Sequence, residues 1–265
     1  MKKMNYFTLY LCYLKNQLMG IIEYKLDFFI GLLSIIIEQV LSLVFIGVLF
    51  SNITSIQKWT FPEILLIYAF STLGRSIHII FFDNMWVFGS KYIQQGELDR
   101  LLLRPINPYF QLIAEKINYQ GIGQIIMGIT ALAISVTKLQ ILITPVLLIK
   151  IFLFVILSGS IYVFIHLFYM VFSFWMTDSQ PIVSAIFSFN QFAQYPLSIF
   201  PKAIHIILLF IIPYSFTSFI PSTLLIQQTE FSKFLYITPI ISIFLGIISY
   251  NFWKIGLKNY KSTGT

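Results

Sequence analysis

The sequence Gln94-Gln95-Gly96-Glu97-Leu98-Asp99-Arg100-Leu101-Leu102-Leu103-Arg104-Pro105-Ile106-Asn107-Pro108 is a polar stretch between two long apolar segments. Gly96 breaks the preceding structure, and the acidic Glu97 and Asp99 favour a helix N-terminus directly after it. Leu98, Leu101 and Leu102 recur at helical spacing, which gives one apolar stripe. Arg104 closes the last turn, and Pro105 and Pro108 prevent continuation. We therefore predict a short amphipathic helix with defined ends, the alternative being a solvated loop on the lipid head groups.

The composition of the whole chain sets its class. Hydrophobic residues make up 58% of the 265 residues, charged residues make up 10%, and the mean hydropathy is +0.85. A soluble domain carries about 25% charged residues, so we predict an all-α integral membrane protein. The formal net charge of +7 is not a nucleic-acid signal until the positions of the lysines are known. The single cysteine, Cys12, rules out an internal disulfide.

Residues 1–27 have the pattern of an amphipathic helix in the membrane interface. At 100° per residue, one side gathers Thr8, Lys15, Asn16, Glu23 and Asp27, and the other gathers Phe7, Leu11, Leu14, Leu18 and Ile22. Packing of this helix against other spans is the alternative. The polar interruptions and the lack of a small-residue cleavage site argue against a cleavable signal peptide.

Six segments have the length and apolarity of transmembrane helices: Phe28–Phe50, Pro62–Phe82, Ile117–Val136, a fourth ending near Phe174, Ile182–Phe200 and Phe234–Trp253. An outer interfacial piece over Ile141–Leu148, broken by Pro145, is expected before the fourth. Gly121, Gly123 and Gly128 predict close helix packing in the third. Pro213 and Pro221 interrupt residues 203–226, which we interpret as a re-entrant helical hairpin on the outer side, sheltered by protein.

The distribution of basic residues supports this topology. Four lysines of the N-terminus, four basic residues of segment 83–116 and three lysines of the C-terminus fall on one side, and five lysines fall on the other. The positive-inside rule then places both termini and segment 83–116 in the cytoplasm. The excess of positive charge is mostly a topology signal.

The chain lacks the motifs of a self-contained enzyme. It has no phosphate-binding Gly-x-x-x-x-Gly-Lys-Ser/Thr, and its histidines show no metal-ligand spacing. No catalytic residue, bound cofactor or metal is expected. Glu38 and Arg75 fall inside predicted spans, where ionisable groups are costly. They are either a gate or substrate-facing pair, or a structural salt bridge between two spans. Asn190, Gln191, Gln194 and Tyr195 either line a pathway or bond to neighbouring helices.

Three groups of residues carry a resemblance over nearly the whole chain. They are Gly96-Glu97-Leu98-Asp99-x-Leu101-Leu102-x-Arg104-Pro105-Ile106-Asn107-Pro108, Tyr195-Pro196-Leu197-Ser198-Ile199-Phe200, and Ile212-Pro213-Tyr214 with Phe219-Ile220-Pro221. In this order they resemble the membrane subunits of ABC-2 type transporters, in the branch of about this length that is entirely membrane-embedded. The departure from the family pattern that matters is the absence of a recognisable substrate motif, which leaves the cargo open.

The resemblance implies a permease formed by a single domain, residues 1–265, with six spans, an N-terminal interfacial helix, a cytoplasmic coupling helix and an outer re-entrant hairpin. Gly96 to Pro108 would couple to a separate ATPase subunit, with Leu98 and Leu102 in its cleft and Glu97, Asp99 and Arg104 at the rim. Two ATPases, which carry ATP and Mg, and a second permease, identical or related, complete the unit in a bacterial cell membrane. Drugs, organic cations, lipids or glycans are the implied cargo. A secondary transporter and a membrane-embedded lipid-processing enzyme are the alternatives; no nucleic acid is expected as a partner.

Overall fold

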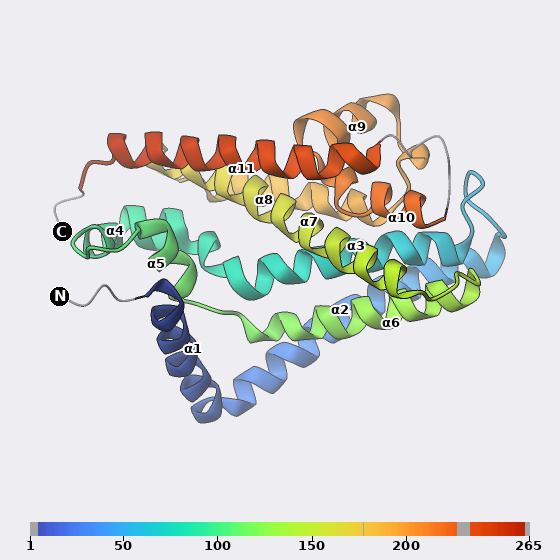
Figure 1. The fold of residues 1–265 in the computed structure, drawn as a ribbon, viewed down its shortest axis with the longest axis horizontal. Helices are drawn as coiled ribbons and strands as arrows, with labels where there is room; N and C mark the ends of the chain where they lie inside the picture. Colours follow the sequence, from blue (N-terminus) through green and yellow to red (C-terminus); the bar gives the residue numbers. More distant parts are fainter. Residues whose placement is uncertain (1–4, 177, 227–233, 263–265) are drawn as a thin grey trace.

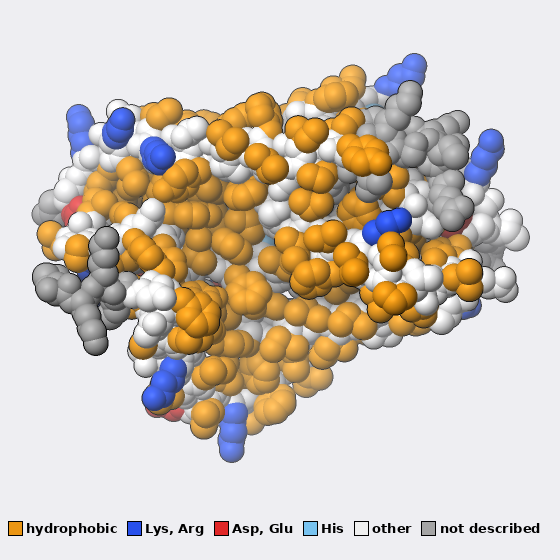
Figure 2. Space-filling view, in the orientation of Figure 1, with side chains coloured by type: hydrophobic (Ala, Val, Ile, Leu, Met, Phe, Trp, Pro, Cys, Tyr) orange, Lys and Arg blue, Asp and Glu red, His pale blue; other side chains and the backbone are white. Residues whose placement is uncertain are grey.

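The computed structural model describes residues 5–176, 178–226 and 234–262, which are mostly helical and contain no strand. Five stretches of this described part are long and apolar enough to cross a membrane: Lys25–Asn52, Phe61–Gln94, Tyr119–Lys138, Pro145–Phe174 and Tyr236–Asn259. They correspond to the first four predicted spans and the last one. Hydrophobic side chains cover the middle of the face shown in Figure 2, and most of its Lys and Arg side chains lie toward the two ends.

The long helices run side by side along the molecule (Figure 1). They are α2 (Lys25–Asn52), α3 (Phe61–Phe82), α6 (Ile122–Lys138), α7 (Pro145–Met170) and α11 (Phe234–Asn259). α3 lies at the centre, packed against α6 and α7, while α7 also packs against α11. A 3-10 segment, η1 (Asp83–Val87), and a π segment, η2 (Phe88–Gln94), extend α3 toward residues 95–116, which we call the polar segment.

Local sequence signals explain where two of these helices begin. Thr60 and Glu63 form a capping box at the start of α3, in which the Thr60 backbone N–H donates to Glu63 Oε2 at 2.8 Å. The Thr144 hydroxyl accepts from the Leu147 N–H at 3.2 Å, and Pro145 occupies the first turn of α7. The outer piece predicted over Ile141–Leu148 is therefore wrong, because Pro145 starts the span and does not break it.

Glycines bring α3 close to its neighbours. A Cβ added at Gly128 of α6 would lie 2.7 Å from Leu73 Cγ of α3, and one added at Gly74 of α3 would lie 1.7 Å from Ser158 Oγ of α7. Only hydrogen fits at these positions, so the helices approach as the third-span glycines predicted.

The fifth predicted span, Ile182–Phe200, is shorter and broken in the structure. α8 (Gln180–Ser188) continues as a 3-10 segment, η5 (Phe189–Gln194), and Tyr195 is extended with φ −126° and ψ 157°. The reason is Pro196, because a residue before proline is disfavoured in the helical region. α8 and η5 nevertheless lead the chain from the end of α7 toward α9 at the opposite end of the molecule (Figure 1).

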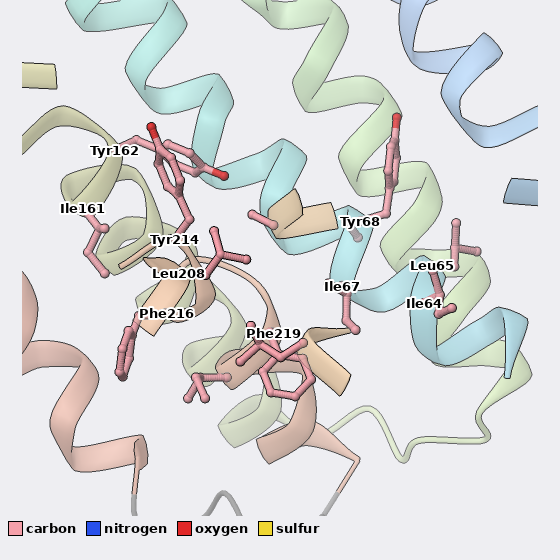
Figure 3. Packing of buried hydrophobic residues seen from close by; sticks show 14 of the residues in the cluster. Ile64, Leu65, Ile67, Tyr68, Ile161, Tyr162, Leu208, Tyr214, Phe216 and Phe219 are labelled. Carbon is pink, nitrogen blue, oxygen red and sulfur yellow. The ribbon is translucent and has the colours of Figure 1, made fainter. Parts of the chain in front are cut away.

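Residues 203–226 bend sharply. α9 (Lys202–Ile206) with η7 (Ile207–Ile211) meets η8 (Tyr214–Phe216) and α10 (Phe219–Leu225) at 75°, so the pair is either one broken span or a re-entrant loop. Figure 3 shows its side chains Leu208, Tyr214, Phe216 and Phe219 packed beside Ile161 and Tyr162 of α7 and Ile67 of α3. This hydrophobic cluster fixes the bend against the central helices.

α1 (Tyr6–Glu23) and the polar segment lie near the C-terminal end of α11, at the end of the molecule away from α9 and α10 (Figure 1). The polar segment folds into α4 (Glu97–Leu102) and α5 (Pro108–Ala114). A second buried cluster, which includes Phe88, Leu101 and Trp253, joins it to α7 and α11. The break between α1 and α2 at Tyr24 agrees with a separate N-terminal helix.

Candidate functional site

A cavity of about 590 Å³ lies among α2, α3, η1, α8 and η5. Its lining combines charges, amides, hydroxyls and aromatic rings: Glu38, Gln39, Leu41, Ser42, Phe45, Arg75, Trp86, Ser184, Phe187, Ser188, Asn190, Gln191, Gln194 and Tyr195. The two sets of polar residues that the sequence analysis places within predicted spans thus line one cavity. Two other cavities, of about 480 and 600 Å³, lack this combination: among their described lining residues the first has Lys150 as its one charge and the second has none.

Glu38 and Arg75 are at the same height in the bundle. Glu38 lies about 14 residues before the end of α2 and Arg75 about 14 residues after the start of α3, so each is roughly 21 Å from the α2–α3 connection. Within the described residues, neither side chain has an ion pair within 4.0 Å or a hydrogen bond. The structural salt bridge considered from the sequence is therefore not formed. Both side chains are left facing the cavity.

Gln39 fixes the rotation of α2. Its side chain is 3% exposed, and Tyr68 Oη of α3 donates to Gln39 Oε1 at 2.7 Å. Because Gln39 points at α3, the adjacent Glu38 borders the cavity, and Ser42 and Phe45 follow it on the same helical face. This buried contact holds the part of α2 that borders the cavity against α3.

The four polar residues of the fifth segment differ in their roles. Asn190 is buried, and its side-chain oxygen accepts a hydrogen bond from Tyr162 Oη, which also lies 3.2 Å from Ser71 Oγ and accepts from Thr217. Asn190 therefore both lines the cavity and ties η5 to α3 and α7. The side chains of Gln191 and Gln194 have no hydrogen bond to another described residue, so their amides are available to a ligand.

The polar segment forms two short helices. Gly96 has φ 75°, a left-handed conformation that glycine adopts without strain, and Glu97 and Asp99 occupy the first turn of α4 as predicted. Pro108 does not act as a stop but occupies the first turn of α5, and Asn107 Oδ1 caps that helix by accepting from Tyr109 N–H at 2.9 Å. Pro105 lies in the turn between the helices.

The leucines of α4 divide in a way that corrects the expected roles. Leu98 and Leu101 are 0% exposed and pack inside this chain, so Leu98 does not face a partner. Leu102 is 44% exposed and Leu103 is 86% exposed. The outward apolar surface of the segment is therefore made by Leu102 and Leu103. Gln111 of α5 connects the buried side of the polar segment, because its side-chain amide donates to the carbonyls of Leu101 and Ile106, both at 3.1 Å.

Ion pairs and hydrogen bonds hold the polar segment to its surroundings. Arg100 pairs with Glu97 at 2.8 Å and with Glu115 at 3.1 Å. Burial alone would lower the pKa of Arg100, but Glu115 and Glu97 raise it above its ordinary value. Lys116 pairs with Asp83 at 2.7 Å. Glu97 is therefore engaged in an ion pair within this chain and is not a free charge at the rim of the expected ATPase interface.

The N-terminal helix is attached to this segment. Gln17 Nε2 of α1 donates to the Ala114 carbonyl at 2.8 Å, and Gln17 Oε1 accepts from the Ile117 N–H at 2.6 Å. Arg104 donates to Tyr13 Oη at 3.3 Å, and the rings of Tyr6 and Phe110 lie 4.9 Å apart. α1, α4 and α5 therefore form one connected unit.

A family model described as "ABC-2 family transporter protein" matches residues 36–264. The chain belongs to the ABC-2 transporter family. Neither a curated protein nor a solved structure matches it with significance. Members of this family are multi-pass membrane subunits of transporters that generally work with ABC ATPases, so this ABC-2 protein is a transport subunit and not itself an enzyme.

One further cluster of this ABC-2 protein was missed from the sequence. His78 of α3 and His166 of α7 are fully buried and share a hydrogen bond of 2.6 Å between Nε2 and Nδ1. The rings of Trp86 and Phe187, both of which line the cavity, pack on His166 at 4.7 Å. The one available signal was that both histidines fall within apolar spans, where polar side chains need a partner. Among the described residues, no group of three or more metal-ligating side chains occurs.

Proposed function

We propose that this chain is the membrane subunit of an ATP-driven exporter and that the 590 Å³ cavity is part of its translocation pathway. The observation that carries the proposal is that Glu38 and Arg75 line one cavity halfway along the apolar helices together with Gln191 and Gln194. The amides of these two glutamines have no hydrogen-bond partner among the described residues. Charged groups at this depth are costly and mark pathways. The aromatic and aliphatic lining suits the apolar part of an amphiphile.

The polar segment is the proposed docking site of the ATPase. Leu102 and Leu103 offer an exposed apolar contact beside charged residues, an arrangement typical of an interface centre with a polar rim. Gly96 and the turn at Pro105 fix the ends of α4, so the contact is rigid. ATP and Mg would bind to the partner ATPases, of which two are expected in the complete transporter.

A second permease subunit is the proposed partner of α2. Only Gln39 and Ile46 of this 28-residue helix are buried, which leaves a long apolar face on the side of the cavity. A like or related subunit placed there would close the pathway. In this arrangement the complex lies in a bacterial cell membrane with both termini and α4 in the cytoplasm, α1 in the inner interface and the bent pair α9–α10 as an outer re-entrant hairpin.

The test is export by the assembled complex. Ser188 lines the cavity, so Ser188→Trp should fill part of it and abolish ATP-dependent efflux of an amphiphilic dye, while the ATPase still copurifies with the chain. Ala133→Trp, at an exposed position of α6 outside that cavity, is the control and should leave efflux intact. Normal efflux by the Ser188→Trp variant would remove the cavity from the pathway. Efflux that needs an ion gradient and no ATP would indicate a secondary transporter.

A further inference from the structure

The balance of charge in the cavity limits what it can bind. Among its described lining residues, Glu38 and Arg75 are the two charged side chains, one of each sign. They are not paired with each other or with any other described residue within 4.0 Å. A charge inside a bilayer that is not paired within the protein requires a partner, which can be water or a ligand. The cavity thus presents one negative and one positive group that are both open to a ligand.

Ligands with a single charge fit this arrangement poorly. A cation drawn to Glu38 would also meet the positive field of Arg75, and an anion drawn to Arg75 would meet the negative field of Glu38. Like-charge juxtaposition in a desolvated site is a strong element of discrimination. A ligand with one positive and one negative group can form a favourable charge interaction with each residue. Neither Glu38 nor Arg75 is then left desolvated without a partner.

The uncharged lining supports the same chemistry. Phe45, Trp86, Phe187 and Tyr195 place aromatic rings around the cavity, and aromatic faces bind organic ammonium groups. Gln191 and Gln194 carry amide N–H groups that can donate to the oxygens of an anionic group. Leu41 and Phe45 of α2 give the cavity an apolar wall for a hydrocarbon tail.

We propose that the cavity selects amphiphiles with a zwitterionic head group, with Glu38 contacting the cationic group and Arg75 the anionic group. This inference rests on the proposed function, since it specifies the cargo of the same pathway. It narrows that cargo to one head-group class, in preference to organic cations, anionic lipids and uncharged glycans. The apolar wall also requires a tail, so a soluble zwitterion without one should not bind.

The experiment measures binding to the full-length chain in nanodiscs of phosphatidylglycerol, a lipid without a zwitterionic head. Radiolabelled dodecylphosphocholine is the probe, and binding to empty nanodiscs is subtracted. Competitors share the dodecyl tail: dodecyltrimethylammonium, dodecyl phosphate and dodecyl maltoside. Free phosphocholine tests the tail. We expect saturable binding, with the three tailed competitors and free phosphocholine each at least tenfold weaker than unlabelled dodecylphosphocholine.

Two substitutions separate the roles of the charges. Glu38→Gln should shift the preference toward dodecyl phosphate, and Arg75→Gln should shift it toward dodecyltrimethylammonium. Glu23→Gln and Lys150→Gln remove one charge of each sign outside the cavity and should leave the ranking unchanged. The ranking in the unsubstituted chain decides the inference even if a variant fails to fold.

The possible results distinguish the inference from the proposed function. If a singly charged or uncharged amphiphile competes as well as the zwitterion, or if the two substitutions do not shift the preference, the cavity binds amphiphiles but the zwitterion inference is wrong. If no amphiphile binds saturably, both the inference and the cavity's role in transport are wrong. Equal binding of free phosphocholine would make the site one for soluble zwitterions and would overturn the requirement for a tail.

Discussion

His78 Nε2 and His166 Nδ1 lie 2.6 Å apart, and their other ring nitrogens, His78 Nδ1 and His166 Nε2, have no hydrogen-bond partner among the described residues. The two residues are 88 positions apart in the sequence and fully buried in the structure. This contact joins α3 to α7 behind the aromatic wall of the cavity. It therefore couples the packing of the central helices to the shape of the proposed pathway.

The histidine contact predicts a specific stability pattern. His78→Phe or His166→Phe alone should lower the free energy of unfolding by about 1–3 kcal/mol, because the remaining imidazole loses its one partner in a dry site. Joint replacement by Phe should recover part of that loss, since no polar atom is then stranded. Thermal unfolding of the purified variants measures this. Losses that simply add in the double variant would show that the hydrogen bond contributes nothing.

The leucines of α4 predict two separable defects. Leu102→Asp should leave expression and membrane insertion normal but abolish copurification of the ATPase and export, because Leu102 is 44% exposed. Leu98→Asp should instead lower the amount of folded protein, since an uncompensated charge in a buried cluster costs about 3–5 kcal/mol. A Leu102→Asp variant that still assembles and exports would leave the polar segment without a coupling role.

The topology can be tested with single cysteines in a Cys12→Ser background. Leu103→Cys and Lys258→Cys, both exposed, should resist an impermeant thiol reagent in intact cells and react after lysis. Leu142 is 84% exposed in the connection between α6 and α7, and Leu142→Cys should react in intact cells. The motivation is the 11-to-5 asymmetry of basic residues described above. Labelling of Leu103→Cys from outside would contradict the assignment of α4 to the cytoplasm.

Two glycines provide a matched pair for the packing of α3. Gly74→Ala should destabilise the protein by about 1–3 kcal/mol, because its Cβ would lie 1.7 Å from Ser158 Oγ and would push α3 from α7. Gly47→Ala has nothing within 4 Å and should be neutral or stabilising by about 0.5–1 kcal/mol. Unfolding temperatures of both variants measure the difference. Equal effects would mean that the close approach is not required.

Much of the helical organisation follows from local sequence, and this part could be predicted. Five spans, the helix start after Gly96 and the close packing of Gly128 all depend on hydropathy, backbone conformation or residue size. The break before Pro196 has an equally local cause, the conformational restriction before proline, although the predicted span runs through it.

The wrong predictions depended on long-range packing. Helical periodicity places Leu98 and Leu102 on one stripe but does not say which turn is covered by α7 and α11. Glu38 and Arg75 lie within apolar helices, as expected from the sequence. Whether they pair depends on the rotations of α2 and α3, which tertiary contacts such as the Gln39–Tyr68 hydrogen bond help to determine. The contact between His78 and His166 requires the same tertiary information.

The continuity of residues 61–94 has a mechanical consequence. This 34-residue helical stretch passes from the α2–α3 connection through Arg75 to the residue pair before Gly96, with no loop between. An axial displacement of α4 would therefore reach Arg75 through η2, η1 and α3. Glu38 belongs to a different helix and need not travel with it. A movement of α4 driven by the ATPase would then shift Arg75 along the membrane normal relative to Glu38. Such a shift would change the direction of the electric field in the cavity as well as the width of the cavity.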